Sequence, residues 1–215
     1  MREKIRAGLD EASKYYDDSV FSERGFENPV AFKKKIVKII LSYDKRLQYK
    51  KLLDAGCGNG NFLEYAERFF ETYGIDFSKN AINIAKKRCK KSKLFVSPAE
   101  KLRFKHGCFD IIVCLGSLEH FVDMNKALSE MVRVLKEKGI AIIHVPNSYY
   151  LIHMMLGIHD HGQINWRMGT ESEWTAILSK YMKVLKCYKW NTHWYLKWIP
   201  RRYCCHFTFL CENCR

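Results

Sequence analysis

Short apolar runs alternate with stretches of helical period along most of this chain. Each run has the length of a strand and is almost continuously hydrophobic, as in a parallel sheet that helices cover on both faces. The runs predict strands at "KKLLDAG", "ETYGID", "KLFVS", "FDIIVCLG" and "GIAIIHVPN", followed by two more near "KVLKCYKW" and "HFTFLCE". This alternation is typical of an α/β fold with a doubly wound, mostly parallel sheet.

The polar stretches between the strands carry signals for helix ends. Ser78 is the expected N-cap of a helix over residues 78–91, and Gly139 is expected to close a helix over residues 125–139. A further helix is predicted over residues 61–70, directly before the second strand. These helices would fill the connections that parallel strands require.

A capping box predicts one more helix near the end of the chain. Thr170 and Glu173 have the spacing in which each side chain binds the backbone N–H of the other residue. The apolar positions that follow share one helical face: Trp174, Ile177, Leu178 and Tyr181.

Composition favours a single domain without a membrane span. The 215 residues are 47% hydrophobic, which is enough for one sizeable core, and no repeat or flexible linker divides the chain. We expect residues 1–48 to form an N-terminal helical lid, residues 49–146 the ligand-binding core, and residues 147–215 a substrate-side segment with the C-terminal strands. Nine scattered cysteines fit reduced thiols in a cytoplasmic protein, without disulfides. The first residues carry mixed charge without an apolar h-region and no run of eighteen uncharged apolar residues occurs, so we expect neither secretion nor a membrane span.

The most informative stretch is the glycine turn "LLDAGCGNGNF", residues 52–62. Gly56, Gly58 and Gly60 lie between a predicted strand and a predicted helix, where backbone can approach a ligand and helix-terminal N–H groups can face it. A dinucleotide fingerprint requires a glycine at position 61, which is Asn61 here. The turn therefore indicates a nucleotide-type site but disfavours a dinucleotide such as NAD.

Two acids narrow the choice of ligand. Asp54 ends the first core strand, where a carboxylate would repel a pyrophosphate but attract an ammonium or sulfonium group. Asp76 ends the next strand, about where a ribose-diol acceptor belongs in a nucleotide-binding βαβ unit. Two acids without a phosphate-binding lysine predict an adenosyl cofactor that carries no phosphates.

Several motifs in a fixed order then carry a family resemblance. "DAGCGNG", "YGIDFSKNAINIAKKR" and "FDIIVCLGSLEHFVDMNKALSEMVRVLKEKG" resemble the class I S-adenosylmethionine-dependent methyltransferases, specifically the ubiquinone/menaquinone-biosynthesis-type small-molecule subgroup. The resemblance runs from about "SKYYDD" to "HVPNS", roughly two thirds of the chain. It implies a Rossmann-like sheet of seven strands with an antiparallel last strand, S-adenosylmethionine as cofactor, and S-adenosylhomocysteine as product.

The resemblance also implies roles for individual residues around the cofactor. The glycines would approach its methionine part with Asp54 in the surrounding network, Asp76 would hold the ribose hydroxyls, and Leu115 backbone would face the ammonium. Phe77 would lie against the adenine, and Tyr15 or Tyr16 would belong to a lid. The cofactor-binding set is Tyr16, Asp54, Gly56, Cys57, Gly58, Gly60, Asp76, Phe77, Ala99, Glu100 and Leu115.

One histidine is the candidate for acid–base chemistry. Methyl transfer from a sulfonium depends mainly on alignment, but the acceptor proton needs a base. His120 in "SLEHF" follows the fourth core strand, where the family places methyl donor and acceptor together. A structural or substrate-contact histidine is the alternative, and we expect Glu119 to orient a loop.

Two segments invite a metal hypothesis that we do not adopt. "YYLIHMMLGIHDHGQINWRMG" follows the fifth strand and should wall the acceptor pocket, yet its His153, His159, Asp160 and His161 have no clear ligand spacing. "CCHFTFLCENC" contains only one C-x-x-C pair and is better interpreted as buried thiols on a terminal strand. We therefore predict no metal.

The sequence allows more than one class of methyl acceptor. We favour a small or lipid-like molecule, since no base-amine motif follows the fourth strand and no RNA-binding module is appended. The net charge of +14 keeps a tRNA or rRNA methyltransferase as the alternative, and a catalytically silent cofactor-binding partner protein is a further one. Basic residues mixed with Trp190, Trp194, Tyr195 and Trp198 also suit peripheral contact with an anionic membrane, or phosphate and base contacts with RNA. The alternative is that these aromatic residues belong to the core and the charges form a solvated face. The oligomeric state does not follow from these residues.

Overall fold

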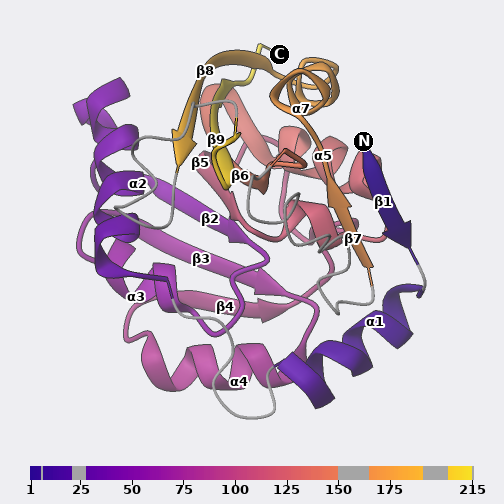
Figure 1. The fold of residues 1–215 in the computed structure, drawn as a ribbon. Coiled ribbons are helices and arrows are strands. Elements are labelled where there is room, and N and C mark those ends of the chain that lie inside the picture. Colours follow the sequence, from indigo (N-terminus) through magenta and orange to yellow (C-terminus); the bar gives the residue numbers. More distant parts are fainter. Residues whose placement is uncertain (6, 21–27, 150–164, 191–202, 215) are drawn as a thin grey trace.

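The computed structural model describes residues 1–5, 7–20, 28–149, 165–190 and 203–214. A seven-stranded sheet forms its centre (Figure 1). Its strands are β2 (Lys51–Ala55), β3 (Glu71–Asp76), β4 (Lys93–Val96), β5 (Phe109–Leu115), β6 (Leu135–Pro146), β8 (Lys183–Trp190) and β9 (His206–Glu212). Their order across the sheet is β4-β3-β2-β5-β6-β9-β8.

The strand directions confirm the predicted sheet. The neighbours from β4 to β6 all pair in parallel, whereas β9 runs antiparallel to β6 on one side and to β8 on the other. The order changes direction between β2 and β5, and ligands of doubly wound sheets bind in the crevice that opens at such a point.

Helices cover both faces of the sheet, as Figure 1 shows. One face carries α2 (Val30–Tyr43), α3 (Asn61–Ala66) and α4 (Lys79–Arg88), whose buried apolar residues pack against those of β2, β5 and β6. The other face carries α5 (Met124–Val134) and α7 (Glu171–Leu178). The other helical elements among the described residues are α1 (Leu9–Tyr15), a π-helix (Tyr16–Val20), and two short 3₁₀ turns at Lys45–Leu47 and Leu118–His120.

The predicted helix caps form as expected. Ser78 Oγ accepts a hydrogen bond from Ala81 N at 2.9 Å, so Ser78 is the N-cap of α4. Thr170 and Glu173 form a reciprocal capping box at the start of α7. Trp174 is fully buried on the helical face that was predicted to be apolar.

Three predicted helices extend too far. The helix predicted over 78–91 ends at Arg88, three residues early. The helix predicted over 125–139 ends at Val134, because Leu135 already pairs with Phe109 of β5 and the backbone of residues 135–139 belongs to β6. The helix predicted over 61–70 ends at Ala66, because the chain must turn tightly to begin β3. The latter two boundaries depend on pairing partners far away in the sequence, which local helix propensity does not report.

A second, two-stranded sheet was not predicted. Strand β1 (Arg2–Ile5) pairs antiparallel with β7 (Asn165–Met168), and these segments lie side by side in Figure 1. The prediction missed β1 because its four residues carry mixed charge and no apolar alternation. This small sheet brings the start of the chain next to the residues that follow β6.

Within the described part of the chain, no helix has the length and apolar character needed to cross a bilayer. All nine cysteines are free thiols in this structure. The thiols of Cys204, Cys205 and Cys211 are buried at the start of β9 and within it, in line with the interpretation of a thiol-bearing terminal strand.

Candidate functional site

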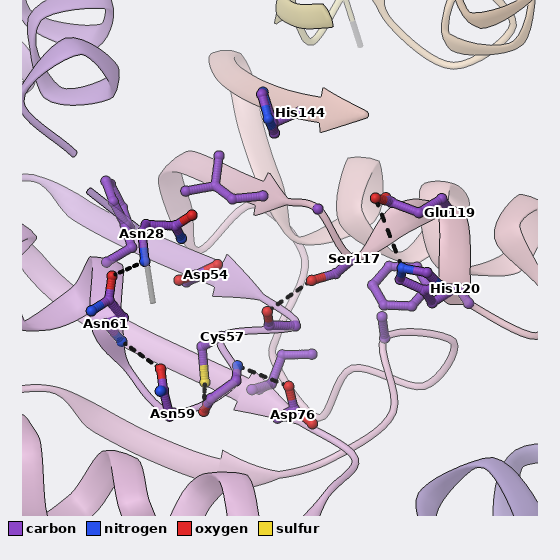
Figure 2. A pocket seen from close by; sticks show the side chains of 18 of the residues that line it. Asn28, Asp54, Cys57, Asn59, Asn61, Asp76, Ser117, Glu119, His120 and His144 are labelled. Carbon is purple, nitrogen blue, oxygen red and sulfur yellow. Dashed lines mark hydrogen bonds and ion pairs between the residues drawn. The ribbon is translucent and has the colours of Figure 1, made fainter. Parts of the chain in front are cut away.

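A pocket of about 650 Å³ opens at the carboxyl ends of the parallel strands (Figure 2). This is the position that doubly wound sheets use for their ligands. The predicted site residues that line the pocket are Tyr16, Asp54, Gly56, Cys57, Gly58, Asp76, Phe77, Ala99, Glu100, Leu115 and His120. The structure therefore gathers nearly the whole predicted set in one cavity.

The glycine turn brings backbone close to the loop that follows β5. Gly56 has a φ of +81°, and a Cβ at this position would lie 2.5 Å from Ser117 Cβ. Ser117 Oγ donates a hydrogen bond to the Gly56 carbonyl at 2.9 Å, as Figure 2 shows. A larger residue would push this loop away, so Gly56 shapes the pocket floor.

Gly60 does not line the pocket, unlike the other predicted glycines. Its φ is +75°, and an added Cβ would lie 2.8 Å from Cys89 Sγ and 3.0 Å from Ala85 Cβ. The contact of Gly60 is therefore with α4 and the residue that follows it. Its role in this structure is to let α3 start close to α4.

Two buried carboxyl groups face the glycine turn. Asp54 Oδ1 is buried and has no hydrogen-bond partner among the described residues. Burial and the neighbouring Asp76 raise the pKa of Asp54 to about 8. Asp76 accepts hydrogen bonds at 2.9 Å from the backbone N–H groups of Gly58 and Ser78, yet burial still raises its pKa to about 6. A cationic group or a hydroxyl group of a ligand would stabilise the ionised forms of both acids.

The segment around Tyr16 docks onto the start of α4 and borders the pocket. The Asp17 carboxylate accepts hydrogen bonds from Ser78 Oγ and, at 3.0 Å, from Asn80 N. Tyr16 is buried, and its ring lies 5.3 Å from that of Phe77 and 6.2 Å from that of His120. The aromatic residue predicted for a lid therefore lies between a cofactor-side residue and the candidate base.

Glu119 and His120 form the polar end of the pocket (Figure 2). His120 Nδ1 lies 2.6 Å from the carbonyl oxygen of Asn165, which can only accept, so Nδ1 carries the proton in the neutral ring. His120 Nε2 lies 3.9 Å from Glu119 Oε1. Burial raises the pKa of Glu119 to about 8, and its Oε2 has no hydrogen-bond partner among the described residues.

The pocket also contains residues that sequence reasoning did not place there; among them is Trp190, which was expected at a membrane-facing surface and instead packs against Phe32 and Lys35. They come from the segment before α2, from α2 itself, and from the ends of β5, β6, β8 and β9: Asn28, Phe32, Lys35, Ser117, His144, Trp190 and His206. A polar histidine inside the apolar run "GIAIIHVPN" was the available signal for His144. The contributions of α2 and β9 depend on tertiary packing and had no local signal.

Several other predictions concern residues outside the described ranges. His153, His159, Asp160 and His161 fall there, as do Trp194, Tyr195 and Trp198. Among the residues that the structure does describe, no three or more His, Cys, Asp or Glu side chains gather in a way that could hold a metal ion.

A doubly wound sheet that ends with antiparallel strands is typical of class I S-adenosylmethionine-dependent methyltransferases. The glycine turn, with two acids and no phosphate-binding lysine, fits the same class. Residues 53–143 match the family model described as a methyltransferase domain, Methyltransf_11. This part of the chain is therefore similar to a methyltransferase domain.

Relatives in sequence match about half of the chain. The chain is 37% identical over 111 residues to the uncharacterized protein MJ0638 of Methanocaldococcus jannaschii, covering 50% of this chain and 47% of that protein. It is 35% identical over 139 residues to a ubiquinone biosynthesis O-methyltransferase of Pelagibacter ubique, covering 56% and 58%. The chain thus spans about half of the length of these relatives.

A solved structure supports the fold over a longer range. Magnesium protoporphyrin IX methyltransferase (ChlM) from Synechocystis PCC 6803, with bound SAH, superposes with a TM-score of 0.71. The match covers 96% of this chain and 100% of that one at 15% sequence identity. At this identity the likeness shows the fold, including the part of the chain after residue 143.

Proposed function

We propose that this chain transfers a methyl group from S-adenosylmethionine to a small or lipid-like acceptor. The observation that carries the proposal is the pair of buried acids at the glycine turn, Asp54 with an unpartnered oxygen and Asp76 beside it. Such acids fit a ligand with an ammonium, a sulfonium and a ribose diol. Lys35 is the one lysine or arginine among the described lining residues, and the turn itself offers no cation for a pyrophosphate.

The residues that would hold the cofactor follow from their places in the pocket. Gly56 and Gly58 let backbone approach the methionine part, with Cys57 between them. Asp54 would face the ammonium together with the Leu115 backbone. The adenosine end of the cofactor would contact residues at or after the ends of β3 and β4 and the segment around Tyr16 that packs on α4. These residues are Tyr16, Asp76, Phe77, Ala99 and Glu100.

The bound sulfonium would supply an activated methyl group, so the protein has to align the acceptor and accept its proton. His120 is placed for the second task. Because Nδ1 donates to the Asn165 carbonyl, Nε2 is the atom of the neutral ring that can take a proton. Glu119 lies next to Nε2, where its carboxylate would stabilise the protonated imidazole.

Calorimetry tests the ligand class. We expect S-adenosylmethionine and S-adenosylhomocysteine to bind and NAD not to bind, because the glycine spacing and Asp54 disfavour a pyrophosphate. Asp76→Ala should weaken binding of S-adenosylhomocysteine by about 1.5 to 3 kcal/mol, the range for lost charge-assisted hydrogen bonds. Asp10→Asn, an exposed acid on α1, is the matched control and should leave binding unchanged. Micromolar NAD binding without a response to S-adenosylhomocysteine would contradict the proposal.

We also propose that the protein works in the cytoplasm and contacts anionic membrane peripherally while it takes up an amphiphilic acceptor. The support is the sequence of residues 180–203, in which basic residues alternate with tryptophan and tyrosine, together with the net charge of +14. Half of this segment, residues 191–202, lies outside the described residues. An RNA methyltransferase is the alternative that the same charge allows.

A further inference from the structure

One half of the pocket lies away from the glycine turn and differs from it in chemistry. Its described lining residues come from α2, from the carboxyl ends of β6 and β8, and from the start of β9. We refer to them as the ring cluster: Phe32, Lys35, His144, Trp190 and His206. In Figure 2, His144 on β6 lies across the view from Asp76.

Four rings of the ring cluster pack together. The ring of Phe32 lies 4.9 Å from that of His144 and 5.4 Å from that of Trp190. His144 and His206 are stacked at 4.9 Å with an interplanar angle of 20°. The spacings are those of favourable aromatic pairs, and the assembly forms an aromatic part of the pocket lining.

His144 contributes to this surface as a neutral ring. Its Nδ1 lies 2.7 Å from Thr208 Oγ1 of β9, which fixes the ring orientation. Burial, with a smaller effect from His206, holds the pKa of His144 well below its usual value. A neutral imidazole stacks on a second ring without charge repulsion. His144 therefore contributes an uncharged aromatic ring to the ring cluster.

Two hydrogen-bond donors of the ring cluster have no acceptor in the described structure. Trp190 Nε1 is buried from solvent and has no hydrogen-bond partner among the described residues. Lys35 Nζ lies 3.7 Å from the centre of the Trp190 ring, and within the described ranges no carboxylate forms an ion pair with it. Burial alone lowers the pKa of Lys35. An ammonium over an indole, next to an unused indole N–H, is suited to an anionic oxygen.

The charges of the pocket are therefore divided between its two halves. The described acids that line it, Asp54, Asp76, Glu100 and Glu119, belong to the ends of β2 and β3 and to the loops after β4 and β5. Lys35 is the one lysine or arginine among the described lining residues and belongs to the ring cluster. A cationic ligand would be drawn to the acidic half and an anionic ligand to the ring cluster.

We propose that the ring cluster is the acceptor subsite and that the acceptor is a planar aromatic compound carrying a carboxylate, with its ring on the cluster and its carboxylate bound by Lys35 and the Trp190 indole N–H. The proposal rests on the proposed function, since it assigns the acceptor half of the same pocket. It narrows the acceptor from a small or lipid-like molecule to an aromatic acid.

Binding of matched probes tests this without turnover. The full-length protein is saturated with S-adenosylhomocysteine and titrated with 1-hydroxy-2-naphthoate, with its uncharged amide 1-hydroxy-2-naphthamide, and with cyclohexanecarboxylate. We expect the naphthoate to bind at least tenfold more tightly than either other probe, because only it has both the flat ring and the charge. Lys35→Gln should reduce naphthoate affinity at least fivefold and leave amide affinity unchanged.

Two further variants keep the outcome interpretable. Lys38→Gln removes an exposed lysine of the same helix that does not line the pocket, and it should leave all affinities unchanged. Trp190→Phe keeps a ring but removes the N–H, so it should lower naphthoate affinity more than amide affinity. Equal binding of the naphthoate and the amide, or the same loss in Lys35→Gln and Lys38→Gln, overturns the proposal. Failure of S-adenosylhomocysteine to bind would instead overturn the proposed function.

Discussion

Individual carboxyl groups determine how this pocket responds to pH. Burial raises the pKa values of Asp54 and Glu119 to about 8 and that of Asp76 to about 6. Near neutral pH, Asp54 and Glu119 therefore hold protons in the protein without ligand. A cationic ligand would favour their ionised forms, so its binding should release protons and strengthen as pH rises toward 8.

Asp54→Asn should make the stability of the ligand-free protein less sensitive to pH. The folded-state pKa of Asp54, about 8, lies above the unfolded value near 4, so the stabilising effect of its proton is complete below pH 4 and is lost as pH rises toward 8. Urea unfolding at pH 5 and pH 8 measures the free energy of unfolding of both proteins. Relative to the parent protein, Asp54→Asn should be more stable at pH 8 than at pH 5, by on the order of a few kcal/mol.

The same variant should bind S-adenosylhomocysteine more weakly, because an amide cannot carry the charge that faces the ammonium. Asp110→Asn, an acid on β5 paired with Lys136 at the surface, is the control and should show neither effect. A pH-independent stability difference between Asp54→Asn and the parent would mean that Asp54 is ionised in the folded protein throughout this range.

His120→Gln should lower the rate of methyl transfer sharply once an acceptor is in hand. A base must be unprotonated to take a proton, so the parent rate should rise with pH, and general-base catalysis typically contributes 10²–10⁴-fold. The affinity for S-adenosylhomocysteine should change little, because the role proposed for His120 is to take the acceptor proton and not to hold the cofactor. Near-normal turnover with an unchanged pH profile would assign His120 to packing.

At the scale of elements, the small β1–β7 sheet supports the candidate base. The Asn165 carbonyl at the start of β7 accepts the hydrogen bond from His120 Nδ1. The Asn165 side chain is itself held by Ala7, through Ala7 N to Oδ1 at 3.1 Å and Nδ2 to the Ala7 carbonyl at 3.0 Å. The N-terminal segment thus fixes the residue that orients the imidazole.

Asn165→Ala should therefore impair turnover more than it impairs binding. Loss of two buried hydrogen bonds should cost about 1–3 kcal/mol in the free energy of unfolding and loosen the His120 ring. We expect kcat to fall severalfold while the affinity for S-adenosylhomocysteine stays within twofold. Steady-state kinetics and calorimetry measure the two quantities separately.

Asn213→Ala is the matched control for this prediction. Asn213 is buried, and its amide donates to the carbonyls of Leu135 and Lys136, away from the pocket. It should lose similar stability and keep its kcat. Equal losses of kcat in both variants would show that the effect of Asn165 is one of general stability.

Strands and caps were predictable because their signals are local. Continuous apolar runs identified all seven strands of the main sheet, and Ser78 and Thr170 cap their helices as expected. The end of α5 was not predictable, because residues 135–139 suit a helix locally and become strand through pairing with β5 and a contact to Asn213. Strand β1 likewise exists through its partner β7.

The site was predictable to a similar degree and for a related reason. Asp54 and Asp76 lie at the carboxyl ends of their strands and His120 follows β5, and parallel strands bring their carboxyl ends to one edge of the sheet. The ring cluster could not be assembled from sequence, because its members come from α2, β6, β8 and β9. Only the order of the strands in space brings Trp190 and His206 to the same cavity.

The whole molecule carries a charge that its pocket does not explain. With a net charge of +14, the protein should float with anionic liposomes at low salt and lose this binding as ionic strength passes the physiological range. Neutralising Lys197, Arg201 and Arg202, which lie outside the described residues, should weaken flotation if the aromatic and basic segment is the contact.

A triple variant of exposed lysines provides the control for charge alone. Lys86, Lys87 and Lys90 lie at the end of α4 and just beyond it, and changing them to glutamine removes the same charge elsewhere. Equal losses in the two triple variants would mean that membrane binding has no defined surface. Absence of flotation together with tight, salt-dependent binding of tRNA would favour the RNA methyltransferase.

The position of β9 has a consequence for how the protein is made. Strand β9 follows β8 in the chain but lies between β6 and β8 in the sheet. Neither β6 nor β8 can therefore pair with β9 until residues 206–212 have left the ribosome. The five strands from β4 to β6 can assemble earlier, and they then expose the apolar edge of β6 while roughly sixty more residues are translated. A nascent chain stalled before residue 206 should therefore be held by chaperones or aggregate, and emergence of residues 206–212 should be the event that makes it protease-resistant.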